Sequence, residues 1–290
     1  MIIIKQILIL IATSLVLFST AYSKNVNKIY KSENVSNYFS GVLSINNEGY
    51  LSSYNYFKKI KGLEDNHYRY SQIYLNSLVN LQKISEAFKY SKVLERKKLD
   101  NFESNLIIFI YHLKNRNLNK AKEYALRINK IDNLNVIQDL ISKTINNWIN
   151  LENKNYDQAE KSLNEIDPRF EDLKKIQIAF LNCFYQTDLI ENKFKAITAN
   201  KNLDFSRYDY FYSNYLISKN DIKKAKKIIN NALTKNPRSL ILNQLNNDLK
   251  NVKLKNKFTD KFDCKQLSHS ISEILYVVSN ALSSQSVLMM

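Results

Sequence analysis

The side chains that most often perform catalysis are few and scattered in this chain of 290 residues. The three histidines are His67, His112 and His269, and none lies four residues from a second histidine or a cysteine, the helical spacing of many metal pairs. With only three glycines, the chain offers no glycine-rich loop that would cradle a phosphate, and no serine lies in a nucleophile elbow. We therefore expect no metal, no cofactor and no enzymatic activity, and look for a binding role.

The two cysteines, Cys183 and Cys264, lie in different kinds of sequence. Cys183 falls on the apolar face of a predicted helix, whereas Cys264 follows a polar, lysine-rich stretch. An oxidising compartment permits disulfides. The contrast between the two surroundings nevertheless favours a buried free thiol and an exposed one over a bridge.

The amino terminus has the pattern of an export signal. Residues 1–23 contain no acidic residue and a single lysine, Lys5, before an apolar core from Ile7 to Phe18. Small residues at Ala21 and Ser23 predict cleavage before Lys24. The apolar run is short for a membrane span, so a cleaved signal peptide is favoured over an uncleaved anchor. We expect an exported, periplasmic protein with a short linker over residues 24–33.

The net charge of +16 has two interpretations. A basic surface can bind nucleic acid or an anionic membrane. Of the 43 basic residues, however, only seven are arginine, and the lysines spread over every predicted solvent face. Nucleic-acid surfaces favour clustered arginines. We expect no nucleic-acid partner, and at most peripheral contact with a membrane.

The elements that must position any binding residue are predicted to be short helices. In Ser206–Ser239, two amphipathic stretches meet at a polar turn, where Asp221 is a favourable N-cap, and Pro237 ends the second stretch. Helices this short cannot bury their apolar faces alone, so they must stack on neighbours. The shortage of glycine and proline, three and two residues, also argues for an all-α fold.

Such hairpins recur along the chain at a near-constant interval. The predicted second helices of the first three units start about 34 residues apart, the period of one common class of helical repeat. The next interval is slightly longer, and the last is close to two units, which leaves room for a degenerate unit around Leu173–Asp204. A small residue follows each start by three positions. The pairs are Tyr50 and Ser53, Ile84 and Ala87, Leu118 and Ala121, Tyr156 and Ala159, and Ile222 and Ala225.

These residues resemble the tetratricopeptide repeat family. Ala225, Ile229, Ala232 and Pro237 fit the second-helix pattern of the family in full, and other units keep its first small residue. The resemblance covers about Asn34 to Ser239 and implies a right-handed α-α superhelix, a solenoid of about five to seven hairpins over residues 34–250.

The resemblance also implies where a ligand would bind. Proteins of this family hold peptide segments on the concave face, with first-helix residues one turn apart. An amide there can pair with a peptide backbone and an arginine with a carboxylate. Leu106, Ile110, Leu113, Thr144, Trp148 and Leu151 would lie on the same face, or pack between units as core. The expected groove residues are Arg69, Gln72, Asn76, Asn80, Arg207, Tyr210 and Asn214.

The end of the chain differs from a solenoid cap, which is polar on its outer face. Residues 251–264 read as a linker or frayed helix, and Ser270–Leu282 as an apolar helix. Either further repeats follow and the array is truncated, or this helix packs on a partner. The oligomeric state stays open.

Together, these patterns predict a non-catalytic scaffold that binds a protein or peptide segment in the bacterial cell envelope. Two alternatives stand beside it. The chain is the helical accessory domain of an envelope enzyme whose catalytic part lies elsewhere, or it attaches peripherally to an anionic membrane through its lysines.

Overall fold

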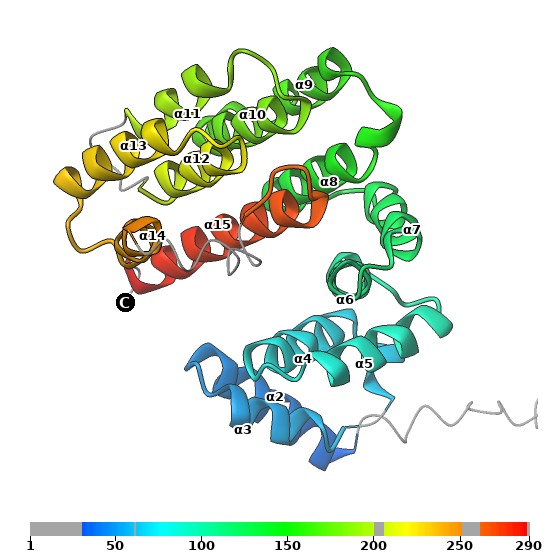
Figure 1. Ribbon diagram of the computed structural model, residues 1–290. Coiled ribbons are helices and arrows are strands. Elements are labelled where there is room, and N and C mark those ends of the chain that lie inside the picture. Colours follow the sequence, from blue (N-terminus) through cyan, green and yellow to red (C-terminus); the bar gives the residue numbers. More distant parts are fainter. Residues whose placement is uncertain (1–30, 61, 200–205, 251–261, 289–290) are drawn as a thin grey trace, which may run out of the picture. The chain divides into compact units, whose positions relative to one another are not determined.

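The protein is all-helical, as predicted. The computed structural model describes residues 31–60, 62–199, 206–250 and 262–288 (Figure 1), and within these ranges it contains no strand. No helix in the same ranges is both long enough and apolar enough to cross a membrane. The predicted signal peptide, residues 1–23, lies outside the described residues.

The chain divides into two compact units, Met1–Asp100 and Asn101–Met290. The first unit contains α2 (Ser32–Asn46), α3 (Tyr50–Phe57), the 3-10 turn η2 (Leu63–Asp65), α4 (Tyr68–Asn80) and α5 (Ile84–Arg96). The second contains α6 (Phe102–Lys114), α7 (Leu118–Asn129), α8 (Val136–Ile149), η3 (Leu151–Asn153), α9 (Tyr156–Asn164), η4 (Pro168–Phe170), α10 (Glu171–Tyr185), α11 (Ile190–Thr198), α12 (Ser206–Ser218), α13 (Ile222–Lys235), α14 (Leu240–Lys250) and α15 (Leu267–Leu288).

Every predicted second helix begins at the residue the repeat spacing indicates. α3, α5, α7, α9 and α13 start at Tyr50, Ile84, Leu118, Tyr156 and Ile222. The degenerate unit is also a hairpin, formed by α10 and α11, and α11 follows α9 at the same interval that separates the first three second helices. The first helix, α2, begins two residues before the predicted start at Asn34.

The turns inside four of the hairpins share one backbone conformation. Two residues before the second helix, Glu48, Gln82, Arg116 and Asn220 all have φ between 56° and 63°. The amide of the next residue then bonds back to the first helix at 2.8–2.9 Å, as from Lys83 N to Leu78 O. This is the hydrogen bond of a Schellman cap. The repeat is therefore visible in backbone geometry as well as in sequence.

The small residue of each second helix is fully buried. Its position lets the paired first helix approach closely, as ridge-and-groove packing requires. The exposed fraction is 0% at all five positions, Ser53, Ala87, Ala121, Ala159 and Ala225. The prediction that these residues occupy one kind of environment is confirmed.

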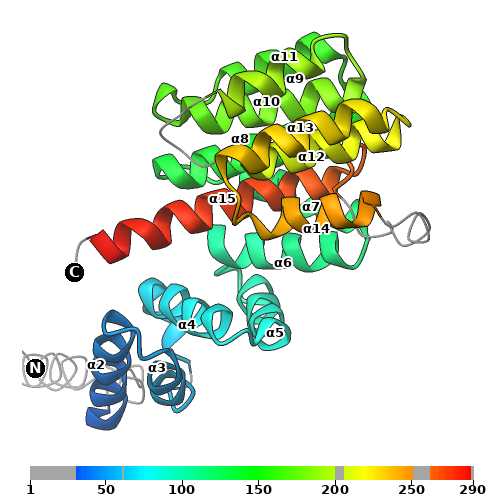
Figure 2. The ribbon, with the colours of Figure 1, turned by 60° about the vertical axis from the view of Figure 1, so that its left-hand side comes forward.

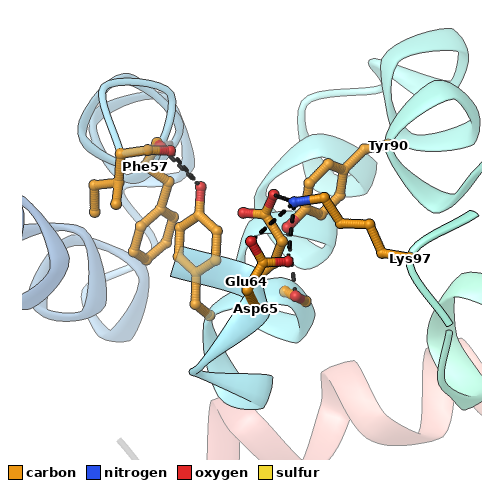
Figure 3. Close-up of polar contacts among 8 residues, drawn as sticks. Phe57, Glu64, Asp65, Tyr90 and Lys97 are labelled. Atoms are coloured by element: carbon orange, nitrogen blue, oxygen red, sulfur yellow. Dashed lines mark hydrogen bonds and ion pairs between the residues drawn. The ribbon is translucent and has the colours of Figure 1, made fainter. Parts of the chain in front are cut away.

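A buried tyrosine joins the two hairpins of the first unit. The Tyr70 hydroxyl donates to the carbonyls of Phe57 and Ile60 at 3.0 Å each, where α3 ends (Figure 3). It thereby satisfies acceptors that a helix C-terminus leaves open. Burial raises the pKa of Tyr70, so the hydroxyl stays a donor. Nearby, Lys97 pairs with Glu64 at 2.7 Å and with Asp65 at 3.0 Å.

The disulfide between Cys183 and Cys264 corrects the expectation of two free thiols. Their Cα atoms lie 5.9 Å apart, and both side chains are buried. Cys183 is on the apolar face of α10, as expected. The error lies with Cys264, which precedes α15 and is carried back onto α10 when that helix packs against it. Sequence polarity around Cys264 gave no sign of this return.

An ion-pair bridge joins α11 to α13 in the second unit. Glu191 accepts from Lys195 at 2.8 Å and from Lys224 at 2.6 Å. The hydrogen bonds from Lys195 and then Lys224 lower the pKa of Glu191 from 4.5 to about 2. A lowered folded-state pKa stabilises the protein above the unfolded-state pKa, and this contribution is lost as the pH falls toward 2.

We expect Glu191→Gln to reduce acid sensitivity. Between pH 5 and pH 2.5 the free energy of unfolding should fall less in the variant than in the parent, by no more than about 1 kcal/mol because the pair is solvent-screened. Urea titrations at both pH values, followed by fluorescence of the single tryptophan in the second unit, measure the difference. Equal pH dependence in the two proteins would contradict the assignment.

Candidate functional site

Two first helices of the second unit, α8 and α10, are covered by α15. α15 packs on α8 and α10, and both views show it running beside the first helices (Figures 1 and 2). Thr144 and Trp148, which the sequence placed on the ligand-binding face, are fully buried. The Trp148 indole donates to Gln177 at 2.6 Å. The prediction that these two residues pack in the core is therefore confirmed. The helix that packs on α8, which carries them, is α15 of the same chain.

Arg207 is one of the expected groove residues, and it pairs with the chain's own Glu273 on α15. Its Nε and Nη2 atoms reach the two carboxylate oxygens at 2.9 and 2.7 Å, a bidentate arrangement. Glu273 is 2% exposed, whereas the Arg207 side chain remains 39% exposed. Burial alone would lower the pKa of Arg207, but the hydrogen bonds and charge of Glu273 raise it above its usual value. The carboxylate that Arg207 binds in the structure is therefore an intramolecular one, and its expected pairing with a ligand carboxylate stays a prediction.

Beside this pair lies an open pocket of about 490 Å³ between α12, α14 and α15. Its walls are largely aromatic. The Arg207 guanidinium lies 4.5 Å from the Tyr276 ring centroid, and the rings of Phe211 and Phe262 stack at 4.1 Å. The residues that line it are Arg207, Tyr210, Phe211, Ile241, Phe262, His269, Ser272, Glu273 and Tyr276.

A second pocket of about 370 Å³ adjoins the first along α14, and the two share Tyr210 and Ile241. Tyr210 is half-buried, and Ile241 is 36% exposed. Leu240, at the start of α14, is the most exposed large apolar side chain among the described residues. The two pockets together offer a partly open surface with apolar side chains at its centre and hydrogen-bonding groups in both pockets, Arg207 in the first and Gln244 and Asp248 in the second.

The other expected groove residues have different environments. Asn214 is 4% exposed, and its amide donates to the Tyr210 carbonyl at 3.1 Å, so its side chain is not on an open surface. In the first unit, Arg69 and Asn76 are exposed on α4. Asn80 donates to the carbonyl of Asn76 at 3.0 Å and also to its side-chain oxygen.

Gln72, also on α4, donates to the Tyr68 hydroxyl at 3.3 Å. The four expected residues of α4 thus share one helix of the first unit, and Arg207, Tyr210 and Asn214 share one helix of the second. Only Arg207 and Tyr210 line a pocket among those described above.

Sequence reasoning missed Glu273 and Tyr276. A signal for the first was present, since Glu273 is the only Asp, Glu, Lys or Arg of α15 and stands directly before the apolar stripe residue Ile274. A single charged residue beside an apolar stripe is buried with the stripe, and a buried charge is stable only when an opposite charge or hydrogen-bond donors pair with it. The partner itself, 66 residues earlier on α12, has no signature in the local sequence.

Within the described residues, no group of three or more histidine, cysteine, aspartate or glutamate side chains is arranged to hold a metal ion. Comparison with known protein families and with curated proteins gives no match to this chain.

Proposed function

We propose that the protein is an exported, non-catalytic scaffold of the tetratricopeptide type that binds a protein or peptide segment in the bacterial cell envelope. In this proposal the hairpins form a right-handed superhelical array, and the ligand contacts first helices. The observation that carries the proposal is the pocket pair on α12 and α14, where Arg207 and Tyr210, both expected from sequence as contact residues, meet an exposed apolar strip.

The chemistry of this surface suits a short apolar or aromatic segment. Tyr210, Phe211 and Tyr276 present rings, which supply contact area with few rotatable bonds, and Arg207 brings hydrogen-bond donors to one end. Glu273 neutralises the arginine, so the surface favours uncharged side chains over acidic ones. Ligand identity would then depend on apolar anchors, with backbone hydrogen bonds fixing their direction.

The Cys183–Cys264 disulfide supports the export part of the proposal. Disulfides persist in oxidising compartments such as the bacterial periplasm and are rare where glutathione and thioredoxin keep thiols reduced. The apolar run and small residues of positions 1–23 point the same way from sequence.

We expect Tyr210→Ala to abolish most ligand capture. The ring lines both pockets, so its removal takes contact area from each, and the protein captured from a bacterial envelope extract should fall at least about tenfold, equivalent to about 1.4 kcal/mol. Quantitative mass spectrometry of pull-downs on immobilised full-length protein measures the change.

The matched control is Tyr215→Ala, which removes a half-buried tyrosine of the same helix that lines neither pocket. This variant should capture as much as the parent protein. Equal capture by Tyr210→Ala and the parent would overturn the placement of the ligand on α12 and α14.

A further inference from the structure

The last helix has the features of a ligand bound by its own chain. α15 crosses the first helices of successive hairpins, packing on α8 and α10 and pairing through Glu273 with α12 (Figure 2). It is not part of the repeated hairpin series. Its only covalent links to the rest of the unit are the segment 251–266 that follows α14 and the disulfide at Cys264.

The two sides of α15 differ as those of a groove-bound amphipathic helix do. Ile271, Ile274 and Val278 are buried at spacings of three and four residues, with Glu273 buried beside them. Tyr276 is 49% exposed on another side. The carboxylate of Glu273 meets Arg207 and also lies 3.4 Å from the Tyr208 hydroxyl, so one acidic residue fixes the position of the helix along α12.

We propose that the first helices α8, α10 and α12 form a binding groove for an amphipathic helix, and that α15 is its resident ligand in cis. A competing helix in trans would carry aliphatic residues at the positions of Ile271, Ile274 and Val278 and an acidic residue at the position of Glu273. This proposal concerns the surface beneath α15 and does not rest on the pockets beside it.

The disulfide determines how strongly α15 holds its place against a competitor. With the bond intact, Cys264 ties the chain to α10 only three residues before α15 begins. Without it, the tether is the whole segment 251–266 from the end of α14. A longer tether lowers the effective concentration of the helix at its groove, so a helix in trans competes better.

One residue of α15 weakens its binding to the groove, so an altered helix could bind more tightly. The Ser270 hydroxyl lies on the buried side of the helix and has no hydrogen-bond partner within the described part of the chain. A buried hydroxyl without a partner opposes binding. A peptide with the α15 sequence that carries Ser270→Ala should therefore bind the groove more tightly than the unaltered peptide.

A charge exchange tests the proposal. The full-length protein carries Cys183→Ala, Cys264→Ala and Arg207→Glu, which removes the tether and sets like charges against Glu273. The probe is a fluorescent peptide with the sequence of residues 266–288 and Glu273→Arg. We expect fluorescence anisotropy to show binding at least about tenfold tighter to this protein than to the same protein with Arg207 restored.

The unaltered peptide carries the same glutamate as the resident α15, so Arg207→Glu weakens both competitors alike, and this peptide should distinguish the two proteins much less than the Glu273→Arg peptide does. If neither peptide distinguishes the two proteins, or if neither binds, the groove proposal is wrong. Circular dichroism establishes that each variant is folded.

A second measurement needs no substitution. Hydrogen exchange of the α15 amides in the full-length protein should be at least about tenfold faster after the disulfide is reduced with dithiothreitol, while α6 and α7 stay unchanged. Unchanged protection of α15 would show a permanent core helix and overturn the proposal. The pull-down with Tyr210→Ala from envelope extract is a separate experiment. A negative result for α15 therefore does not change what that pull-down says about the proposed function.

Discussion

Replacing Cys183 and Cys264 together with alanine should lower the free energy of unfolding of the second unit by about 4 kcal/mol. The disulfide closes a loop between positions 81 residues apart. Closing so long a loop removes a large share of the conformational freedom of the unfolded chain, which raises the free energy of the unfolded state relative to the folded one. The bond also holds α15 at the surface where its apolar side is buried.

The chain contains its own reporter for this measurement. Trp148 is the only tryptophan and is fully buried in α8, so its fluorescence follows unfolding of the second unit. Urea midpoints of the double variant should match those of the parent protein under reducing conditions, and both should lie well below the oxidised parent. Overlapping titrations of the oxidised parent and the double variant would show that the bond does not stabilise the unit.

The helical hairpins could be predicted because the information for them is local. Apolar periodicity, a small residue three positions into the second helix and a polar turn all lie within one unit of the sequence. The start of α7 at Leu118 and the N-cap hydrogen bond that Lys224 N donates to Asp221 Oδ1 follow from such signals. Whether successive hairpins wind into a superhelix depends on small rotations between them, which no residue in the sequence specifies directly.

The candidate site depended on long-range contacts, and the sequence revealed it only in part. Arg207 and Tyr210 were expected on the ligand-binding face, and both line a pocket. The pairing of Glu273 with Arg207 and of Cys264 with Cys183 joins residues that lie 66 and 81 positions apart in the sequence. One lone acid in an apolar helix was the only local hint.

At one pair of facing positions inside the hairpins, the side-chain volumes of the first and second helix vary in opposite directions. Where the first helix has glycine at Gly41, the second has Phe57, and the larger Phe109 is matched by Ala125. All four residues are buried. At the same spacing, also buried, α4 and α5 have Leu75 with Ser91, and α12 and α13 have Ser213 with Ile229. In these four hairpins a small residue on one helix accompanies a large one on the other, as close packing requires.

From this pattern we expect Gly41→Leu to lower the local free energy of unfolding of the first unit by about 3 kcal/mol through overpacking. A Cβ atom at Gly41 would lie 2.5 Å from the Phe57 ring. Phe57 is fully buried and packs against the Tyr70 ring at 5.6 Å, so it has little room to move. The gain in helix propensity on losing glycine, about 1 kcal/mol, is too small to offset this cost.

The matched variant is Gly41→Leu with Phe57→Ser, which copies the pair found at Leu75 and Ser91 in the next hairpin. Each change alone should destabilise α2 and α3, whereas the double variant should recover about 2 kcal/mol relative to the sum of the two, because the new leucine fills the space the ring leaves. Native-state hydrogen exchange of the α2 and α3 amides measures all three variants. Strict additivity would show that these two positions do not share one packing site, and that the exchange of large and small residues between hairpins has another cause.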